Sequence, residues 1–128
     1  MVRFLRLEAL FGARLDQLKE QHLQHAVDAK LAEDIDLEFK RSLYAEADAK
    51  KLELAKDVAA MANAQGGAVI LGVAEYDGRA HQLSPVELRE AEDRRMREIV
   101  ASKTSPVPAF DIAHVPLLPT RRWVTICS

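Results

Sequence analysis

The run Ala68–Ala74, which reads AVILGVA, is apolar at every position. A strand with one face in water alternates apolar and polar residues, so an unbroken apolar run indicates a strand that is buried on both faces. A strong helix is predicted directly before it, over Asp48–Gln65, and Gly66-Gly67 ends that helix because glycine readily adopts the left-handed conformation found at helix ends. The chain therefore needs a central sheet that is covered on two sides.

The other elements follow from local periodicity and turn residues. Apolar residues recur every three or four positions over Leu15–Leu31, which predicts a helix, and every second position over Glu33–Lys40, which predicts a half-buried strand. Asp77-Gly78 predicts a hairpin turn. The motif SPVE, which begins at Ser84, resembles a capping box and predicts a helix over Ser84–Ser102. The remaining predicted elements are a short helix or arm over Phe4–Phe11 and strands over Ala80–Leu83, Phe110–Val115 and Trp123–Cys127.

Together these elements predict an α+β fold, with one domain in which a mixed β-sheet is flanked by helices. We expect an N-terminal arm or helix over residues 1–20 and the domain itself over residues 21–128. The net charge of −2 gives no overall basic excess, so any anion-binding surface must be local. The single cysteine, Cys127, cannot form an internal disulfide, and we expect a cytoplasmic protein. No apolar run approaches the length of a membrane span, so no membrane partner is expected.

Several short motifs occur in an order that is typical of one family. They are Glu33, the strand residues Leu37–Lys40, the helix end Ala62–Gly67, the apolar strand Val69–Val73 and the acidic residue Glu75. The ordered set resembles the Schlafen/AlbA-type DNA-binding domain, and the resemblance covers Gln21–Pro116. It implies a nucleic-acid-binding surface. The nucleotide-binding loop G-x-x-x-x-G-K-[ST] does not occur in the sequence, so the ATP-binding label that relatives often carry gains no support.

The resemblance also implies a candidate metal site. In nucleolytic Schlafen relatives, acidic residues at the positions of Glu33, Glu38 and Glu75 hold a divalent ion that cleaves RNA, and Mg²⁺ or Mn²⁺ takes such oxygen ligands. Glu33 and Glu38 are five positions apart, so on a continuous strand they would point to opposite faces. They can converge only if the chain bends near Glu33. The alternative is that all three are solvated charges at element ends. His81 is the one candidate for a general base near them.

Basic residues beside these carboxylates are candidates for contacts with phosphate groups. The candidates for nucleic-acid binding are Lys40, Arg41, Lys50, Lys51, Arg121 and Arg122. Lys50 and Lys51 fit equally well on a charged helix face that only keeps the protein soluble. We interpret Arg94, Arg95 and Arg97 as a solvated helix face, because two of them follow an acidic residue by four positions.

The sequence thus favours a nucleic-acid-binding module without its own catalysis, which binds DNA or RNA and needs no cofactor. One alternative is a ribonuclease that uses Mg²⁺ or Mn²⁺ at Glu33, Glu38 and Glu75. Another is a scaffold or assembly protein that has lost nucleic-acid binding. The segment Val2–Leu10 is rich in apolar residues and precedes the family motifs, so we predict that it pairs two copies of the chain in a homodimer.

Overall fold

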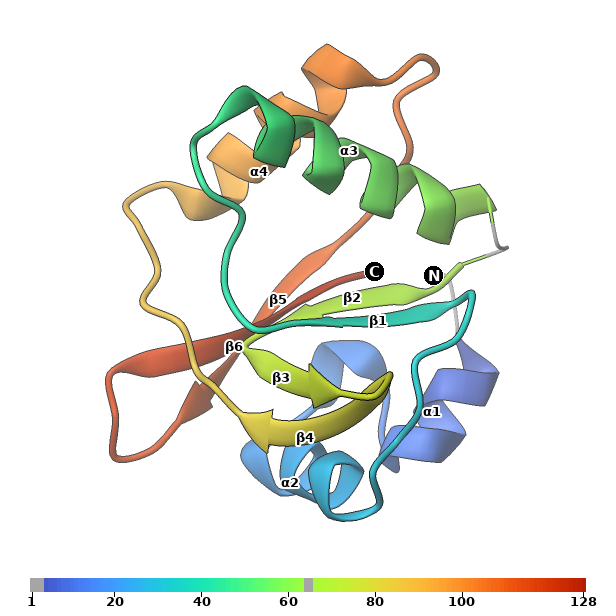
Figure 1. Cartoon of the computed structure of the whole chain (residues 1–128), viewed down its shortest axis with the longest axis vertical. Helices are drawn as coiled ribbons and strands as arrows, with labels where there is room; N and C mark the ends of the chain where they lie inside the picture. Colours follow the sequence, from blue (N-terminus) through green and yellow to red (C-terminus); the bar gives the residue numbers. More distant parts are fainter. Residues whose placement is uncertain (1–3, 64–65) are drawn as a thin grey trace.

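The computed structural model describes residues 4–63 and 66–128. The helices are α1 (Leu5–Phe11), the 3₁₀ turn η1 (Leu15–Gln17), α2 (Glu20–Asp28), α3 (Asp48–Asn63) and α4 (Glu92–Lys103). The strands are β1 (Leu37–Lys40), β2 (Ala68–Leu71), β3 (Val73–Tyr76), β4 (Arg79–Leu83), β5 (Ile112–Leu117) and β6 (Arg122–Cys127). This is the predicted α+β fold with a mixed sheet (Figure 1).

The sheet has the order β1-β2-β6-β5, with β1 parallel to β2 and the other neighbours antiparallel. Strand β2 lies inside the sheet and is buried along its whole length, as the unbroken apolar run predicts. Its side chains alternate between two hydrophobic clusters: Ala68 and Ile70 belong to one, and Val69 and Leu71 to the other. The central strand is therefore covered on both faces.

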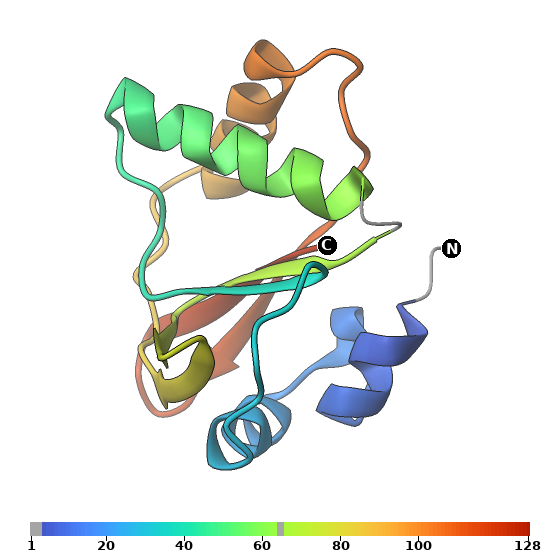
Figure 2. The ribbon, with the colours of Figure 1, turned by 45° about the vertical axis from the view of Figure 1, so that its right-hand side comes forward.

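Helices cover the two faces of the sheet in separate groups. Helices α3 and α4 pack on one face, where Leu54, Val58 and Met96 meet Val69 and Leu71. Helices α1 and α2 and the hairpin β3–β4 lie on the opposite side, as two views of the ribbon show (Figures 1 and 2). The cluster on that side has these fully buried members among others: Leu7, Phe11, Leu23, Phe39, Val73 and Ala80.

The predicted strand over Glu33–Lys40 is wrong for its first half. Asp34 and Leu37 each donate a backbone N–H to the carbonyl of the other, at 3.0 and 3.1 Å, which closes a tight turn. Strand β1 begins only at Leu37. Ile35, which the alternation placed in the core, is 79% exposed at the tip of this turn. The local hydrogen bonds of the turn thus replace the predicted pairing with a neighbouring strand.

Two predicted elements are interrupted. The helix predicted over Leu15–Leu31 consists of η1 and α2, with a break between them. The apolar run is divided into β2 and β3 at Gly72, which has φ of 108° and donates its N–H to Lys40 O at 2.7 Å. A Cβ at Gly72 would lie 3.3 Å from the carbonyl oxygens of Ser84 and Trp123. Glycine is required there because the chain leaves the sheet at this point and starts the hairpin.

The helix predicted over Ser84–Ser102 begins eight positions late, at Glu92. Val86 instead exchanges both backbone hydrogen bonds with Trp123, at 2.7 and 2.9 Å. The SPVE motif therefore joins the end of the hairpin to strand β6 and caps no helix. Helix α3 confirms the helix predicted over Asp48–Gln65 as far as Asn63, and the last two predicted residues lie outside the described residues.

The N-terminal segment packs on the domain itself. Within Val2–Leu10, the described part begins at Phe4, and Leu7 is buried in the same cluster as Phe11. Leu5 is 69% exposed. Most of the apolar surface that we expected to bind a second copy is therefore used within the chain. In residues 4–63 and 66–128, no helix is both long and apolar enough to cross a membrane.

Candidate nucleic-acid interface

Three glutamates that are distant in the sequence line one pocket of about 380 Å³, which we call the acidic pocket. Glu33 comes from the turn before β1, Glu38 from β1 and Glu75 from β3. Lys40 and Arg41 line the same pocket. The structure therefore brings together the acidic residues that the family resemblance singled out, with two basic residues beside them.

The bend that Glu33 requires is the turn between Asp34 and Leu37. Because the turn reverses the chain, the Glu33 carboxylate reaches back and accepts the backbone N–H of Phe39 at 2.9 Å. This contact also occupies an amide at the edge of β1, where no further strand pairs in the described sheet. The bend near Glu33, without which Glu33 and Glu38 could not converge, is therefore present.

The turn is held from two sides. Arg6 of α1 binds Asp36 through both Nε, at 2.9 Å, and Nη2, and it also contacts Asp34 at 3.4 Å. Beneath the turn, a Cβ on Gly67 would lie 2.7 Å from Asp36 O and 2.8 Å from Met61 Sδ. No other residue fits there without displacing backbone. Gly67, the second glycine of the family motif, therefore supports the turn that positions Glu33.

Glu75 reaches the acidic pocket from the hairpin. The pairing of β3 with β4 shifts register between Ala74 and Glu75, and such irregularities change the direction in which a side chain points. The Glu75 carboxylate accepts the N–H of Gly78 at 2.9 Å across the hairpin turn. Its orientation is therefore fixed by the Asp77-Gly78 turn, which the sequence predicted.

Glu38 lies in a partly buried environment close to another carboxylate. Partial burial raises its pKa, and the negative charge of Asp57 raises it further, while Lys40 at 3.4 Å opposes the shift. In the described parts of the chain, no three Asp, Glu, His or Cys side chains are placed so that they could hold a metal ion. The acidic pocket thus gathers three glutamates but does not present a ready set of metal ligands.

Lys40 is surrounded by carboxylates. Its ammonium lies 2.7 Å from Glu53, 3.4 Å from Glu38 and 3.8 Å from Asp57. Burial alone would lower the pKa of Lys40, but the hydrogen bond to Glu53 and the nearby negative charges raise it overall. Lys50 contacts the same Glu53 at 3.0 Å. Two of the predicted phosphate contacts are therefore already engaged in ion pairs.

Arg41 and Arg122 lie in a second pocket, of about 410 Å³, which we call the arginine pocket. Arg41 follows β1 and lines both pockets, whereas Arg122 is the first residue of β6. Both are exposed, and neither guanidinium has an ion pair or hydrogen bond with any described residue. Arg121 and Lys51 do not line either pocket. A third arginine, Arg89, joins the arginine pocket from the segment before α4.

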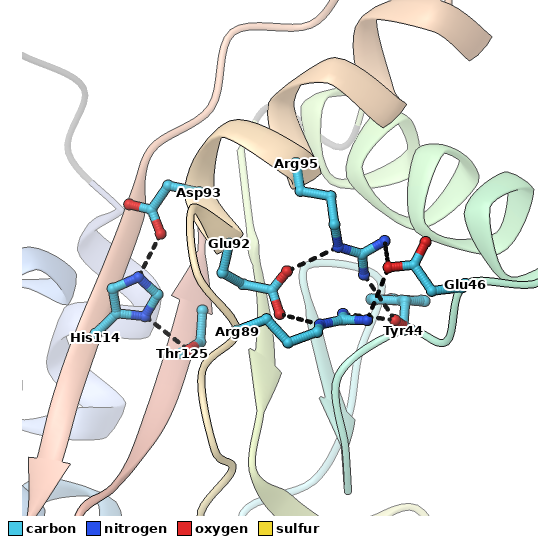
Figure 3. A network of polar contacts seen from close by, with 8 residues as sticks. All are labelled: Tyr44, Glu46, Arg89, Glu92, Asp93, Arg95, His114 and Thr125. Carbon is cyan, nitrogen blue, oxygen red and sulfur yellow. Dashed lines mark hydrogen bonds and ion pairs between the residues drawn. The ribbon is translucent and has the colours of Figure 1, made fainter.

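Arg89 belongs to a polar network that the sequence did not reveal (Figure 3). Glu92, whose side chain is 2% exposed, binds Arg89 at 2.9 Å and Arg95 at 3.0 Å. Both guanidiniums also donate to the carbonyl oxygen of Tyr44 at 3.0 Å, and both contact Glu46. The interpretation of Arg95 as part of a solvated face is therefore wrong. Arg89 and Arg95 each lie three positions from Glu92, and this spacing is the feature of the sequence from which the network could have been predicted.

Two other candidates lie away from the acidic pocket. His81 faces the ring of Tyr76, with centroids 5.7 Å apart, and it is not among the described residues that line the acidic pocket. Cys127 is buried in the sheet, and burial raises the pKa of its thiol to about 12. Neither residue is placed to act on a ligand bound by the three glutamates.

The sequence profile of the family described as "Schlafen, AlbA_2" matches residues 33–126. The chain belongs to the Schlafen, AlbA_2 family. The matched range begins at Glu33 and contains every residue that lines the acidic and arginine pockets. Helices α1 and α2 precede it, so the Arg6 contact with the turn comes from outside the segment that the family shares.

A search of curated protein sequences found no match. Among solved structures, this Schlafen, AlbA_2 chain is similar to the crystal structure of the DIP2311 protein from Corynebacterium diphtheriae, with a TM-score of 0.51 and 18% identity. The match covers 96% of this chain and 24% of that chain. The chain thus spans about a quarter of the length of the protein it resembles, and at this identity the likeness shows the fold alone.

Proposed function

We propose that this chain is a nucleic-acid-binding module without its own catalysis. One observation carries the proposal: Arg41 and Arg122, from opposite ends of the family segment, line one pocket and have no acidic partner in the described chain. Guanidinium groups that are not neutralised by the protein are suited to phosphate oxygens. Membership of the Schlafen, AlbA_2 family supports a role related to nucleic acid.

The direction of a bound strand follows from the two pockets. Arg41 lines both, so a strand whose backbone contacts Arg41 and Arg122 would pass the rim of the acidic pocket. The three glutamates would repel phosphates from the pocket interior and leave room for uncharged groups of a nucleotide. Lys51 is half-buried and Arg121 is exposed, and we expect these two residues to add contacts at the margin of the binding surface.

The test is binding of labelled single-stranded and duplex oligonucleotides at increasing salt. Each phosphate contact steepens the log–log dependence of affinity on salt by roughly 0.7 to 0.9. The double variant Arg41→Ala/Arg122→Ala should flatten this slope, whereas Lys40→Ala should change it little because three carboxylates already surround Lys40. Arg94→Ala, which removes an exposed charge on α4, is the matched control. No binding at low salt would favour a scaffold or assembly protein instead.

A metal-dependent ribonuclease is the second candidate, because Glu33, Glu38 and Glu75 line one pocket. The glutamates as placed do not form a ligand set, so we expect no cleavage. The assay is incubation with structured RNA, single-stranded RNA and DNA in millimolar Mn²⁺ or Mg²⁺. Cleavage that EDTA stops and that Glu38→Gln abolishes would establish the nuclease and refute the binding-only proposal.

A further inference from the structure

The arginine pocket combines cationic side chains from three places in the fold. Arg41 follows β1, Arg89 precedes α4 and Arg122 begins β6. Two hydroxyl groups, of Ser42 and Ser84, line the same pocket. Arg41 and Arg122 are 81 positions apart in the sequence, so only the folded chain brings these residues together.

The three arginines differ in how firmly they are held. Arg89 is oriented by Glu92 at 2.9 Å, by Glu46 at 3.1 Å and by the carbonyl of Tyr44 at 3.0 Å. A guanidinium has five N–H donors, so these contacts leave donors of Arg89 unoccupied. The guanidiniums of Arg41 and Arg122 have no hydrogen bond or ion pair with any residue in 4–63 and 66–128. The pocket therefore contains one guanidinium that the protein orients, that of Arg89, and two guanidiniums that remain available to a ligand.

The pocket has an excess of positive charge, which favours an anionic ligand. Glu87 is the single carboxylate among its described lining residues, and it is exposed. Since Glu92 and Glu46 neutralise Arg89, the excess positive charge comes from Arg41 and Arg122. A phosphate monoester carries nearly two negative charges at neutral pH, whereas a phosphodiester inside a strand carries one. The monoester also offers three terminal oxygens to the donors.

The size of the pocket also favours a phosphate monoester. Its volume of about 410 Å³ is at the small end of the range for small-ligand sites, and Tyr44, Pro85 and Val86 form part of its wall. A concave site of this size accepts one phosphate with part of a sugar, and the rest of the strand would continue past Arg41 along the rim of the acidic pocket. We propose that the arginine pocket binds a phosphate monoester, and that its source is the phosphorylated end of a nucleic-acid strand. The choice of a strand end rests on the proposed nucleic-acid-binding function.

The experiment compares oligonucleotides of one sequence that carry a 5′-phosphate, a 3′-phosphate or only hydroxyl ends, in fluorescence anisotropy. We expect one of the phosphorylated strands to bind roughly tenfold more tightly than the hydroxyl strand, as a few charge-assisted hydrogen bonds allow. Arg122→Gln should reduce this ratio to about one. Arg94→Gln removes an exposed charge on α4, outside the pocket, and should preserve the ratio.

Two further arms separate the sources of phosphate. Inorganic phosphate and a nucleoside monophosphate are titrated into the protein and followed by the chemical shift of the Val86 amide, which lies in the pocket wall. Equal binding of phosphorylated and hydroxyl strands overturns the inference and leaves the nucleic-acid-binding proposal intact. Saturable binding of the monophosphate, lost in Arg122→Gln, with no strand bound at all, supports the phosphate pocket and refutes the strand-end source together with the proposed function.

Discussion

Gly67 shows how one residue can decide the geometry of the acidic pocket. The Asp36 carbonyl accepts the Ala68 N–H at 2.9 Å, directly above the glycine. We expect Gly67→Ala to destabilise the fold by about 1 to 3 kcal/mol, because the added Cβ would lie 2.7 Å from Asp36 O. Urea unfolding measures the loss, and amide hydrogen exchange should show weaker protection of Ala68.

The matched control for Gly67 is Gly78→Ala. Gly78 has φ of 73°, and a Cβ there would meet no heavy atom within 4 Å. Its replacement should cost only the backbone strain of a left-handed alanine, about 1 kcal/mol, and should leave the protection of Ala68 unchanged. Equal loss of Ala68 protection in both variants would mean that Gly67 does not support the turn.

Glu38 links the acidic pocket to the pH dependence of stability. Burial and the charge of Asp57 raise its pKa above the usual value of 4.5, so the folded chain holds this proton more tightly than the unfolded chain does. The contribution of Glu38 to stability is therefore present at pH values below its pKa in the unfolded chain. It is lost as the pH rises through the higher pKa that Glu38 has in the folded chain. Glu38→Gln keeps the neutral form at every pH and should therefore be more stable than the wild type at pH 7.

The expected gain from Glu38→Gln at pH 7 is less than about 1 kcal/mol, because a side chain that is 30% exposed is partly screened by water. The difference should vanish below pH 4.5, where the wild-type carboxyl is protonated in both states. Thermal melts at pH 3 to 8 provide the measurement. A variant that loses stability at pH 7 would show that the ion pair with Lys40 outweighs the desolvation of Glu38.

At the scale of elements, periodicity predicted the parts that a local pattern determines. The buried central strand as far as Leu71, helix α3, the Asp77-Gly78 hairpin and the last two strands were predicted and are confirmed. The conformation of the segment from Ser84 to Ala91 was not predicted, because it depends on the pairing of Val86 with Trp123, which is distant in the sequence. The Asp34–Leu37 turn was missed because alternation continues through it, and only Arg6 and Gly67 reveal why the chain reverses there.

Helix α4 depends on Glu92 for its connection to the segment around Tyr44. The carboxylate is buried and holds two arginines that in turn bind the Tyr44 carbonyl. We expect Glu92→Gln to lower the free energy of unfolding by about 2 to 3 kcal/mol, because both guanidiniums lose their buried charge partner and keep only the exposed Glu46. Chemical denaturation measures this. Glu98→Gln, on the same helix but in an exposed pair with Arg94, should cost less than about 0.5 kcal/mol; equal losses would refute a special role for Glu92.

For the whole molecule, the sequence predicted which residues meet in the acidic pocket but not which ones remain available for phosphate. Glu33, Glu38 and Glu75 line one pocket, and the turn supplies the bend that their spacing requires, but no three such side chains among the described residues could hold the metal ion that the family resemblance implied. The neutralisation of Lys40 comes from Glu53 and Asp57, one and two turns along α3, and the arginine pocket depends on Arg89. Such contacts join elements that local pattern cannot place relative to each other.

The homodimer stays a prediction, and the structure changes the surface on which it depends. Leu7 and Phe11 are buried within the chain, whereas Leu5 and Ile35 are 69% and 79% exposed. Arg6 binds Asp36, so the segments that carry these two exposed side chains are neighbours. We expect multi-angle light scattering at micromolar concentration to give twice the chain mass of 14.3 kDa.

The variant Leu5→Ser/Ile35→Ser should shift this dimer to the monomer without loss of folding, because both side chains are largely in water in the single chain. Leu118→Ser removes an equally exposed side chain, 76% accessible, from the β5–β6 connection and should leave the dimer intact. Circular dichroism confirms that each variant is folded. A wild-type chain that remains monomeric up to about 100 μM would contradict the dimer, since interfaces of ordinary size bind more tightly than that.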